Sequence, residues 1–203
     1  VHKRPFSDLL PADPDVSNLH DLFGDDEMDE AQKQEFVDAH PQPEGMSKSL
    51  APGSFFTVMR DEPLETLEMM GDVDDYIEEM DDSWGIDDRE SLIEMIESLL
   101  DGRAYKSFND TYLAIKTGKL DDVDEEDIES YQATVESLQE VLDISLKEIN
   151  KCPSIIGWDI ERAAYLARTG AHAEDITKDE AWEYLKRAAA LAKKNFWPLY
   201  TSP

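Results

Sequence analysis

The sequence predicts an all-α protein, organised as a single irregular helical bundle domain with an extended N-terminal arm. Apolar residues recur at helical spacing through most of the 203 residues, and helix-capping residue types flank these stretches. No run of alternating apolar and polar residues is long enough to predict a strand. Only residues 55–59 (Phe-Phe-Thr-Val-Met) lean toward β structure, and a helix fits them equally well. We expect the arm to cover residues 1–50 and the helical domain residues 51–203.

Prolines set the predicted arm apart from the rest of the chain. Five of them punctuate residues 1–50, which is typical of irregular structure. Within this stretch, residues 29–39 could form one helix with Phe36 and Val37 facing inward. Residues 40–54 contain three prolines and two glycines and are predicted to be a linker.

Three helices are predicted in the next fifty residues. Leu64, Leu67 and Met70 indicate a short helix that ends at Gly71. Asp72 is then the expected cap of a second helix. Its inward face would carry Val73, Tyr76, Ile77 and Met80.

The third of these helices has the clearest start and stop. Asp87 with Glu90 fits a capping box, and Gly102 follows the last periodic residue. The apolar stripe between them consists of Leu92, Ile93, Ile96, Leu99 and Leu100.

Four further helices complete the prediction. Residues 107–117 follow a Ser cap and end before Gly118, and residues 125–150 form the longest helix. Residues 155–169 form a helix that Gly170 terminates. Thr177 with Glu180 is a second capping box, which starts a helix to about residue 194.

Acidic residues dominate the charge and are concentrated in the middle of the chain. The formal net charge is −29, from 48 acidic and 19 basic residues. Residues 1–50 carry −8, residues 51–150 carry −22 and residues 151–203 carry +1. This distribution has two interpretations, a solvated surface that promotes solubility and a negative face that docks a basic partner. Direct nucleic-acid binding is disfavoured because phosphate recognition needs a basic stripe.

Several other features bear on location and chemistry. Cys152 is the only cysteine, so no intrachain disulfide or multi-thiolate metal site can form, and we expect a cytoplasmic protein. No apolar run is long enough to span a membrane, and no apolar signal segment follows the N-terminus. We therefore expect neither membrane nor secretory association. The oligomeric state is left open.

Known catalytic and metal-binding motifs do not occur. An Asp-x-Glu-x-Asp pattern at Asp25 lacks the glycine and the final glutamate of a calcium loop, and the four histidines are scattered without ligand spacing. No nucleophile elbow, phosphate loop or dinucleotide fingerprint is present. We expect no cofactor, no metal and no catalytic residue, and the protein is more simply explained as a non-enzyme.

Two tryptophan-containing motifs stand out against this background. One is Gly157-Trp158-Asp159-Ile160-Glu161-Arg162, continued by Leu166, Arg168 and Gly170 and then by Ile176, Thr177, Glu180, Ala181 and Trp182. The other is Ser83-Trp84-Gly85-Ile86-Asp87-Asp88-Arg89-Glu90. Together they resemble the signature of the bacterial domain-of-unknown-function 1266 family, typified by YbeU-like and YbeR-like proteins, over about residues 55–195. The resemblance implies an all-helical fold and supplies no activity.

The motif residues have a structural and a functional interpretation. In the structural one, Trp158 and Trp182 anchor the core, while Asp159, Arg162, Arg168 and Glu180 form a buried or semi-buried ion-pair lattice. In the functional one, Trp158, Arg162 and Arg168 line a pocket for an anionic small ligand or substrate. Trp84 and Arg89 belong to the same motif set under either interpretation.

The leading functional hypothesis is an acidic binding protein that neutralises or regulates a basic protein partner. Its most concrete form is an immunity protein that masks the basic groove of an antibacterial toxin. The expected partner-binding residues are Asp74, Asp75, Glu78, Glu79, Asp81 and Asp82, with Asp121, Asp122, Asp124, Glu125 and Glu126 as a second patch. The alternatives are the ligand-binding or enzymatic pocket described above and an effector chaperone or adaptor.

Overall fold

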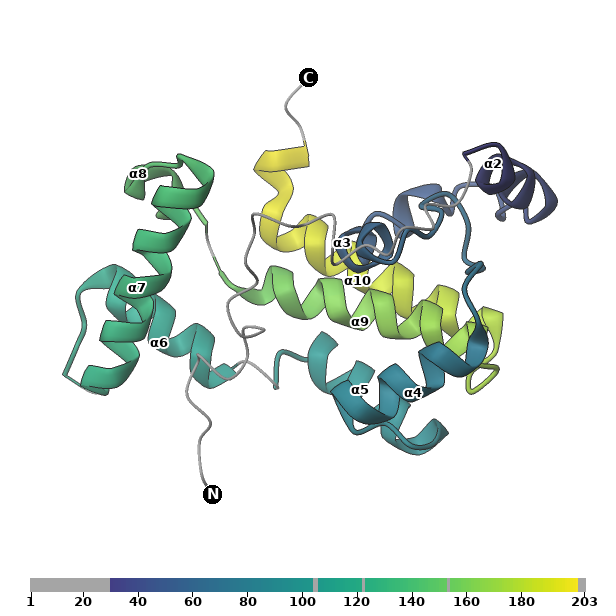
Figure 1. The fold of residues 1–203 in the computed structure, drawn as a ribbon. Helices are drawn as coiled ribbons and strands as arrows, with labels where there is room; N and C mark the ends of the chain where they lie inside the picture. Colours follow the sequence, from purple (N-terminus) through teal and green to yellow (C-terminus); the bar gives the residue numbers. More distant parts are fainter. Residues whose placement is uncertain (1–29, 104–105, 122, 153, 201–203) are drawn as a thin grey trace. The chain divides into compact units, whose positions relative to one another are not determined.

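The structure is a computed structural model that describes residues 30–103, 106–121, 123–152 and 154–200. Their elements are helical, and no strand occurs among them, so the all-α prediction is confirmed (Figure 1). In chain order they are α2 (Glu30–Ala39), η3 (Ser47–Ser49), α3 (Ser54–Met59), α4 (Val73–Trp84), α5 (Arg89–Leu100), α6 (Lys106–Thr117), α7 (Glu125–Leu142), α8 (Leu146–Ile149), α9 (Ile156–His172) and α10 (Lys178–Tyr200).

The described residues divide into two compact units. Residues 30–103 and 156–200 form one unit, called here the core unit, and residues 106–155 form the other, called the inserted unit. Most of the predicted arm, residues 1–29, lies outside the described residues. The helix predicted at 29–39 is present as α2, and the ambiguous segment 55–59 is helical within α3.

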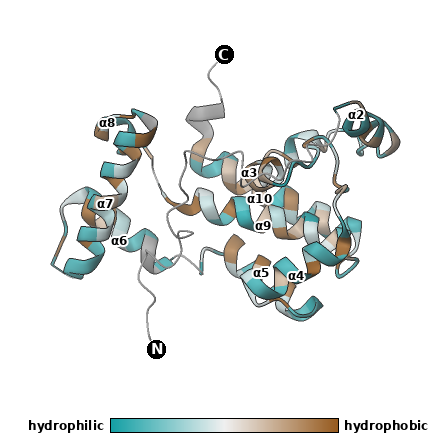
Figure 2. Ribbon diagram, in the orientation of Figure 1, coloured by the Kyte–Doolittle hydropathy of each residue, from teal (hydrophilic) through white to brown (hydrophobic). Residues whose placement is uncertain are grey.

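Helix α9 is the centre of the core unit and packs against α10, α5 and α3. Ten of the twelve positions from 159 to 170 of α9 are buried, and the other two, 161 and 162, are half-buried. Hydrophobic and hydrophilic residues alternate along α4, α5 and α9, as expected of helices that bury one side (Figure 2). Buried apolar residues of α5, α9 and α10 include Leu92, Ile96, Leu99, Ile160, Ala163, Tyr165, Leu166, Ala181, Trp182, Leu185 and Ala188.

Gly170 lies inside α9, which corrects its predicted role as a terminator. A Cβ atom at this position would overlap Cδ2 of Leu92, a residue of α5 that is fully buried. The missing side chain therefore allows α5 and α9 to approach closely. The helix continues to His172, and the chain turns at Glu174, which has a φ of 62°.

Residues 60–72 are irregular, so the short helix predicted over 64–70 is wrong. Its apolar residues do have a core role, because Leu67 and Met69 are buried. The backbone groups that a helix would pair internally are bound instead by the side chains of Glu62 and Arg168. Tertiary contacts override the local helical pattern here.

Helix capping follows the predictions with one shift. The side chain of Asp72 accepts a hydrogen bond from the Asp74 amide at the start of α4. The cap of α5 is Asp88, one residue later than predicted, and its capping-box partner is Ser91 in place of Glu90. The Thr177–Glu180 capping box forms as expected.

The inserted unit contains α6, α7 and α8. The single helix predicted over 125–150 is wrong, because α7 ends at Leu142 and Asp143 adopts a left-handed φ of 51°. Ser145, which falls inside that predicted helix, instead caps α8 and forms a capping box with Glu148. Asx and Ser side chains compete with helix continuation in this way.

The last helix is longer than predicted. It runs to Tyr200 instead of about residue 194, with a non-helical conformation at Phe196 (φ −125°, ψ 18°). Among the described residues, no helix combines the length and the apolar character needed to cross a bilayer.

The close approach at Gly170 predicts that Leu92 decides whether an alanine at position 170 stabilises or destabilises the protein. Gly170→Ala should lower the free energy of unfolding by about 1 kcal/mol, because overpacking a full core outweighs the gain in helix propensity. In a Leu92→Ala background the same change should stabilise the protein, since the clash is gone. Urea unfolding of the wild type, the two single variants and the double variant measures both effects. An equal change in unfolding free energy for Gly170→Ala in the two backgrounds would contradict the packing explanation.

Candidate functional site

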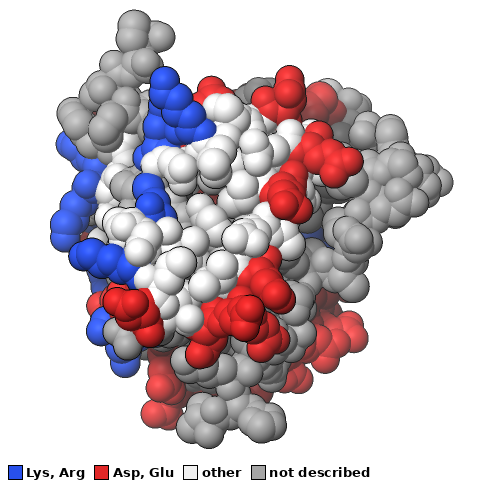
Figure 3. Space-filling view, turned by 90° about the vertical axis from the view of Figure 1, so that its left-hand side faces the viewer, with Lys and Arg blue, Asp and Glu red and all other residues white. Residues whose placement is uncertain are grey.

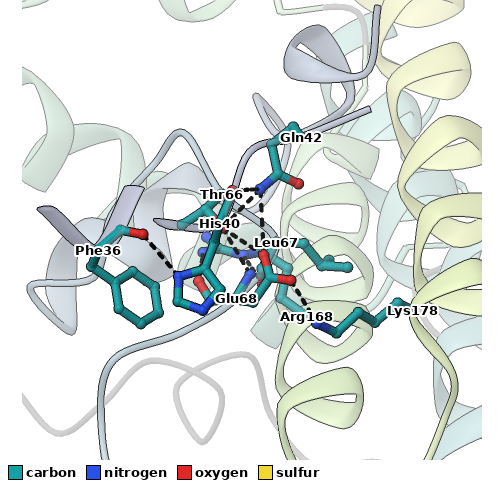
Figure 4. A network of polar contacts seen from close by, with 8 residues as sticks. All are labelled: Phe36, His40, Gln42, Thr66, Leu67, Glu68, Arg168 and Lys178. Carbon is teal, nitrogen blue, oxygen red and sulfur yellow. Dashed lines mark hydrogen bonds and ion pairs between the residues drawn. The ribbon is translucent and has the colours of Figure 1, made fainter. Parts of the chain in front are cut away.

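Arg168 is the most buried arginine of the sequence motif, with 1 % of its surface exposed. Its guanidinium donates to Thr57 Oγ1 at 2.7 Å and to the carbonyl oxygens of Pro63, Leu67 and Glu68 at 3.0–3.4 Å. Part of this arrangement is visible in Figure 4. Arg168 therefore connects α9 to α3 and to the irregular segment 60–72, and its donors are occupied by protein groups.

Glu62 holds the same irregular segment from the other side. Its carboxylate is 4 % exposed and accepts hydrogen bonds from the amides of Met70 and Gly71 at 2.6 and 2.7 Å. It also accepts from the Tyr76 hydroxyl of α4 at 2.5 Å. Burial and this carboxylate raise the pKa of the Tyr76 hydroxyl, so it stays a donor. Glu62 thus fixes the entry into α4.

Glu68 extends this network to the surface (Figure 4). Its carboxylate accepts from Thr66 at 2.6 Å, Lys178 at 2.7 Å and Gln42 at 3.3 Å. Burial raises the pKa of Glu68, but hydrogen bonds from Lys178, Thr66 and Gln42 outweigh it and lower the pKa to about 2. Such a carboxylate remains ionised at neutral pH and suits a structural role better than proton transfer.

Asp159 and Arg162 form an i, i+3 ion pair at 2.8 Å at the start of α9. The Asp159 side chain is fully buried, and its Oδ2 atom has no hydrogen-bond partner. Burial raises the pKa of this carboxyl to about 6, with Arg162 opposing the shift. The Arg162 guanidinium also lies over the Trp84 ring, 5.6 Å from its centroid.

The two motif tryptophans differ in exposure. Trp182 is 7 % exposed and belongs to the core as expected, but Trp158 is 42 % exposed, so a core-anchor role for it is wrong. Trp158 contacts Phe55 and Phe56 of α3, with ring centroids 5.9 and 5.3 Å apart. Phe56 in turn lies 6.2 Å from Trp84 of α4. We call Phe55, Phe56, Trp84 and Trp158 the aromatic patch.

Glu161, which the sequence did not single out, positions this patch. Its carboxylate accepts from the amides of Gly53 at 2.9 Å, Phe55 at 2.5 Å and Phe56 at 3.3 Å, at the start of α3. Gly53 has a left-handed φ of 90° and lies against the α9 backbone. A capping residue more than 100 positions away in sequence leaves no local signal.

Arg89 and Glu180 connect α5 to α10 at the surface. The guanidinium of Arg89 donates to Glu180 Oε1 at 2.5 Å and to the Asp175 carbonyl at 2.6 Å. The hydrogen bond from Arg89 lowers the pKa of Glu180 to about 2, with Thr177 adding to the effect. Of the four residues of the predicted lattice, the buried Asp159 pairs with the partly buried Arg162, and Glu180 pairs at the surface with Arg89. The fourth, Arg168, binds carbonyls and a hydroxyl.

The acidic residues predicted on α4 separate into two kinds. Asp74, Asp75, Glu78, Asp81 and Asp82 are exposed, and none forms an ion pair with a described residue. We call these five the α4 acidic face. Glu79 is half-buried, pairs with Arg60 and accepts from the Tyr165 hydroxyl at 2.8 Å. It therefore joins α4 to α3 and α9.

The second predicted cluster belongs to the inserted unit. Asp121, Asp124, Glu125 and Glu126 are exposed, and Asp122 lies outside the described residues. Asp124 is the residue before α7, and the two glutamates fall in its first turn, where carboxylates favour the helix dipole. Within the described part of the chain, no three His, Cys, Asp or Glu side chains are grouped closely enough to hold a metal ion.

Comparison with known proteins places the chain in a family. The model of the family described as "Protein of unknown function (DUF1266)" matches residues 79–197, more than half of the chain. The chain belongs to this family, which confirms the resemblance seen in the tryptophan motifs. Searches of curated proteins and of solved structures find no match.

The buried guanidinium yields a prediction for stability. Arg168→Met should lower the free energy of unfolding by about 3–5 kcal/mol, because three carbonyls lose their donor and the buried Glu62 loses a nearby positive charge. Arg187→Met is the matched control. It removes an arginine that pairs with Glu97 at the surface and should cost less than ~1 kcal/mol. If urea unfolding shows that Arg168→Met and Arg187→Met lower the free energy of unfolding equally, Arg168 has no special role in stability.

The raised pKa of Asp159 predicts a pH dependence of stability. Because the folded state favours the protonated carboxyl, this group stabilises the protein at acidic pH, and the contribution is lost as pH rises from about 4 through about 6. Asp159→Asn should therefore flatten the curve of unfolding free energy against pH over this range, by ~2 kcal/mol. The exposed Asp74→Asn serves as the control. Superimposable profiles for wild type and Asp159→Asn would show that Asp159 titrates normally.

Proposed function

We propose that this protein is an acidic binding protein that recognises a basic protein partner through α4. The observation that carries the proposal is the α4 acidic face, whose five carboxylates are exposed and without ionic partners among the described residues. Clustered charge of one sign accelerates association with an oppositely charged partner and discriminates against like-charged ones.

Apolar side chains adjoin these carboxylates and support an interface. Val73 and Ile77 of α4 are 37 % and 46 % exposed although they share the helix's apolar side with the buried Tyr76 and Met80. The aromatic patch follows at Trp84, the last residue of α4. Protein interfaces combine apolar anchors with a charged rim, and exposed aromatic residues are frequent anchors.

The concrete form of the proposal is an immunity protein that masks the basic groove of a bacterial toxin inside the cytoplasm. The net charge of −29 and the single cysteine support it. A basic catalytic groove that binds nucleic acid presents the lysines and arginines that an acidic surface complements. Neither a direct nucleic-acid ligand nor a membrane is part of the proposal.

Charge reversal on α4 tests the proposal. The triple variant Glu78→Lys, Asp81→Lys, Asp82→Lys leaves the first turn of α4 intact and should weaken partner binding at least ~30-fold, or ~2 kcal/mol. The partner is first captured with the wild-type protein, identified, and purified, and calorimetry then measures the dissociation constant for each variant.

A matched control separates a local effect from overall charge. The variant Glu44→Lys, Glu136→Lys, Glu140→Lys changes the net charge equally at exposed positions outside α4 and should alter the affinity less than ~3-fold. A captured partner that is not basic, or an α4 variant that binds as tightly as this control, would overturn the proposal.

A further inference from the structure

The inserted unit contains a cavity that the proposed function does not use. Its volume is about 420 Å³, and its walls come from α6, α7 and residues of the stretches 144–152 and 154–155. The apolar lining includes Ile115 of α6, Val135 and Leu138 of α7, and Ile144, Ile149 and Ile155. Ligand-binding cavities in proteins have this size range and this predominantly apolar lining.

The size of the cavity sets the size of a ligand. An engineered protein cavity of about 150 Å³ holds one benzene molecule, so about 420 Å³ accommodates roughly 15 non-hydrogen atoms. A chain of about ten carbons or two fused aromatic rings with a substituent has these dimensions. Protein interiors are otherwise closely packed, and an unfilled apolar space forfeits dispersion contacts that a ligand would restore.

The charged residues of the lining set the charge of a ligand. Asp127 of α7 and Glu148 of α8 contribute to the lining, whereas no described lysine or arginine does. Glu148 already accepts hydrogen bonds from Ser145 through Oε2. Figure 3 looks onto the side where Figure 1 shows α6, α7 and α8, and uncharged surface there is bordered by acidic groups on one side and by basic groups on the other. A carboxylate or phosphate placed beside Asp127 and Glu148 would meet like charge.

We infer that the inserted unit binds one small apolar molecule with a neutral or cationic head group in this cavity. The volume of the cavity limits the size of the ligand, and the aliphatic lining requires an apolar body. Asp127 and Glu148 disfavour a negative charge on its head group. Binding here involves residues of the inserted unit and is independent of partner binding by α4.

The test uses the full chain and the neutral fluorescent probe N-phenyl-1-naphthylamine. We expect saturable binding at one site per chain. Decylamine and decanoate share a ten-carbon chain, and decylamine should displace the probe at least ten-fold more effectively. Asp127→Asn should reduce this preference, and 0.5 M salt in all titrations screens the general negative charge of the protein.

Two variants on α7 locate the site. Thr134 lines the cavity, so Thr134→Trp should fill it and weaken probe binding at least ten-fold. The neighbouring Ala133 is exposed and does not line the cavity, so Ala133→Trp should bind as wild type. If circular dichroism shows that Thr134→Trp is unfolded, Ser130→Leu, another lining position, replaces it.

The single cysteine supplies a second readout. Cys152 lines the cavity and is exposed, so bound decylamine should slow its reaction with the uncharged reagent 4,4′-dithiodipyridine several-fold. The α4 charge-reversal variant should bind the probe normally. Absence of saturable probe binding, equal binding by Thr134→Trp and Ala133→Trp, or stronger displacement by decanoate would each overturn the inference.

Discussion

The buried contacts of Arg168 and Glu62 are the constraint on which the rest of the core unit depends. Residues 60–72 have no helix or strand of their own, yet they connect α3 to α4. Arg168 binds their carbonyls and Glu62 binds their amides, so the segment has a defined path through the interior. The burial of two opposite charges is costly unless each is hydrogen-bonded, and here each has several partners.

This constraint determines what the protein presents to solvent. Arg168 reaches Thr57 in α3, and Glu62 reaches Tyr76 in α4, so both helices are tied to the interior at one side. Phe55 of α3 and the α4 acidic face are exposed to solvent, whereas Phe56 and Trp84 pack against the buried residues Met69, Tyr76 and Tyr165. Helix α4 provides both the buried Tyr76 and the exposed Glu78, so the contacts that fix its buried side also fix the positions of its exposed carboxylates. Among the motif residues, Asp159, Arg168 and Trp182 are buried.

The sequence predicted helices well where capping and periodicity agree, as in α4, α5 and α10. It failed at residues 64–70, where long-range hydrogen bonds from Arg168 replace helical ones, and at residue 143, where a left-handed residue and a Ser cap interrupt a continuous apolar pattern. Gly170 was misassigned because a glycine required for helix–helix contact has the same local signature as a helix terminator.

The candidate site was predictable only in part, for a related reason. Charge density located the acidic residues of α4, but Glu78 and Glu79 are equivalent in sequence and differ only through the Arg60 and Tyr165 contacts of Glu79. Glu161 and the cavity of the inserted unit arise from groups brought together by folding. Single-sequence patterns carry no information on such long-range contacts.

The most direct test of the central claim is hydrogen exchange of the Met70 and Gly71 amides in the wild-type protein. If Glu62 and Arg168 hold the irregular segment as part of the core, these two amides should exchange only through global unfolding, as slowly as the amides of α9. Exchange as fast as that of the exposed turn at Glu44 and Gly45 would contradict the claim, because it would show that the segment opens independently of the core.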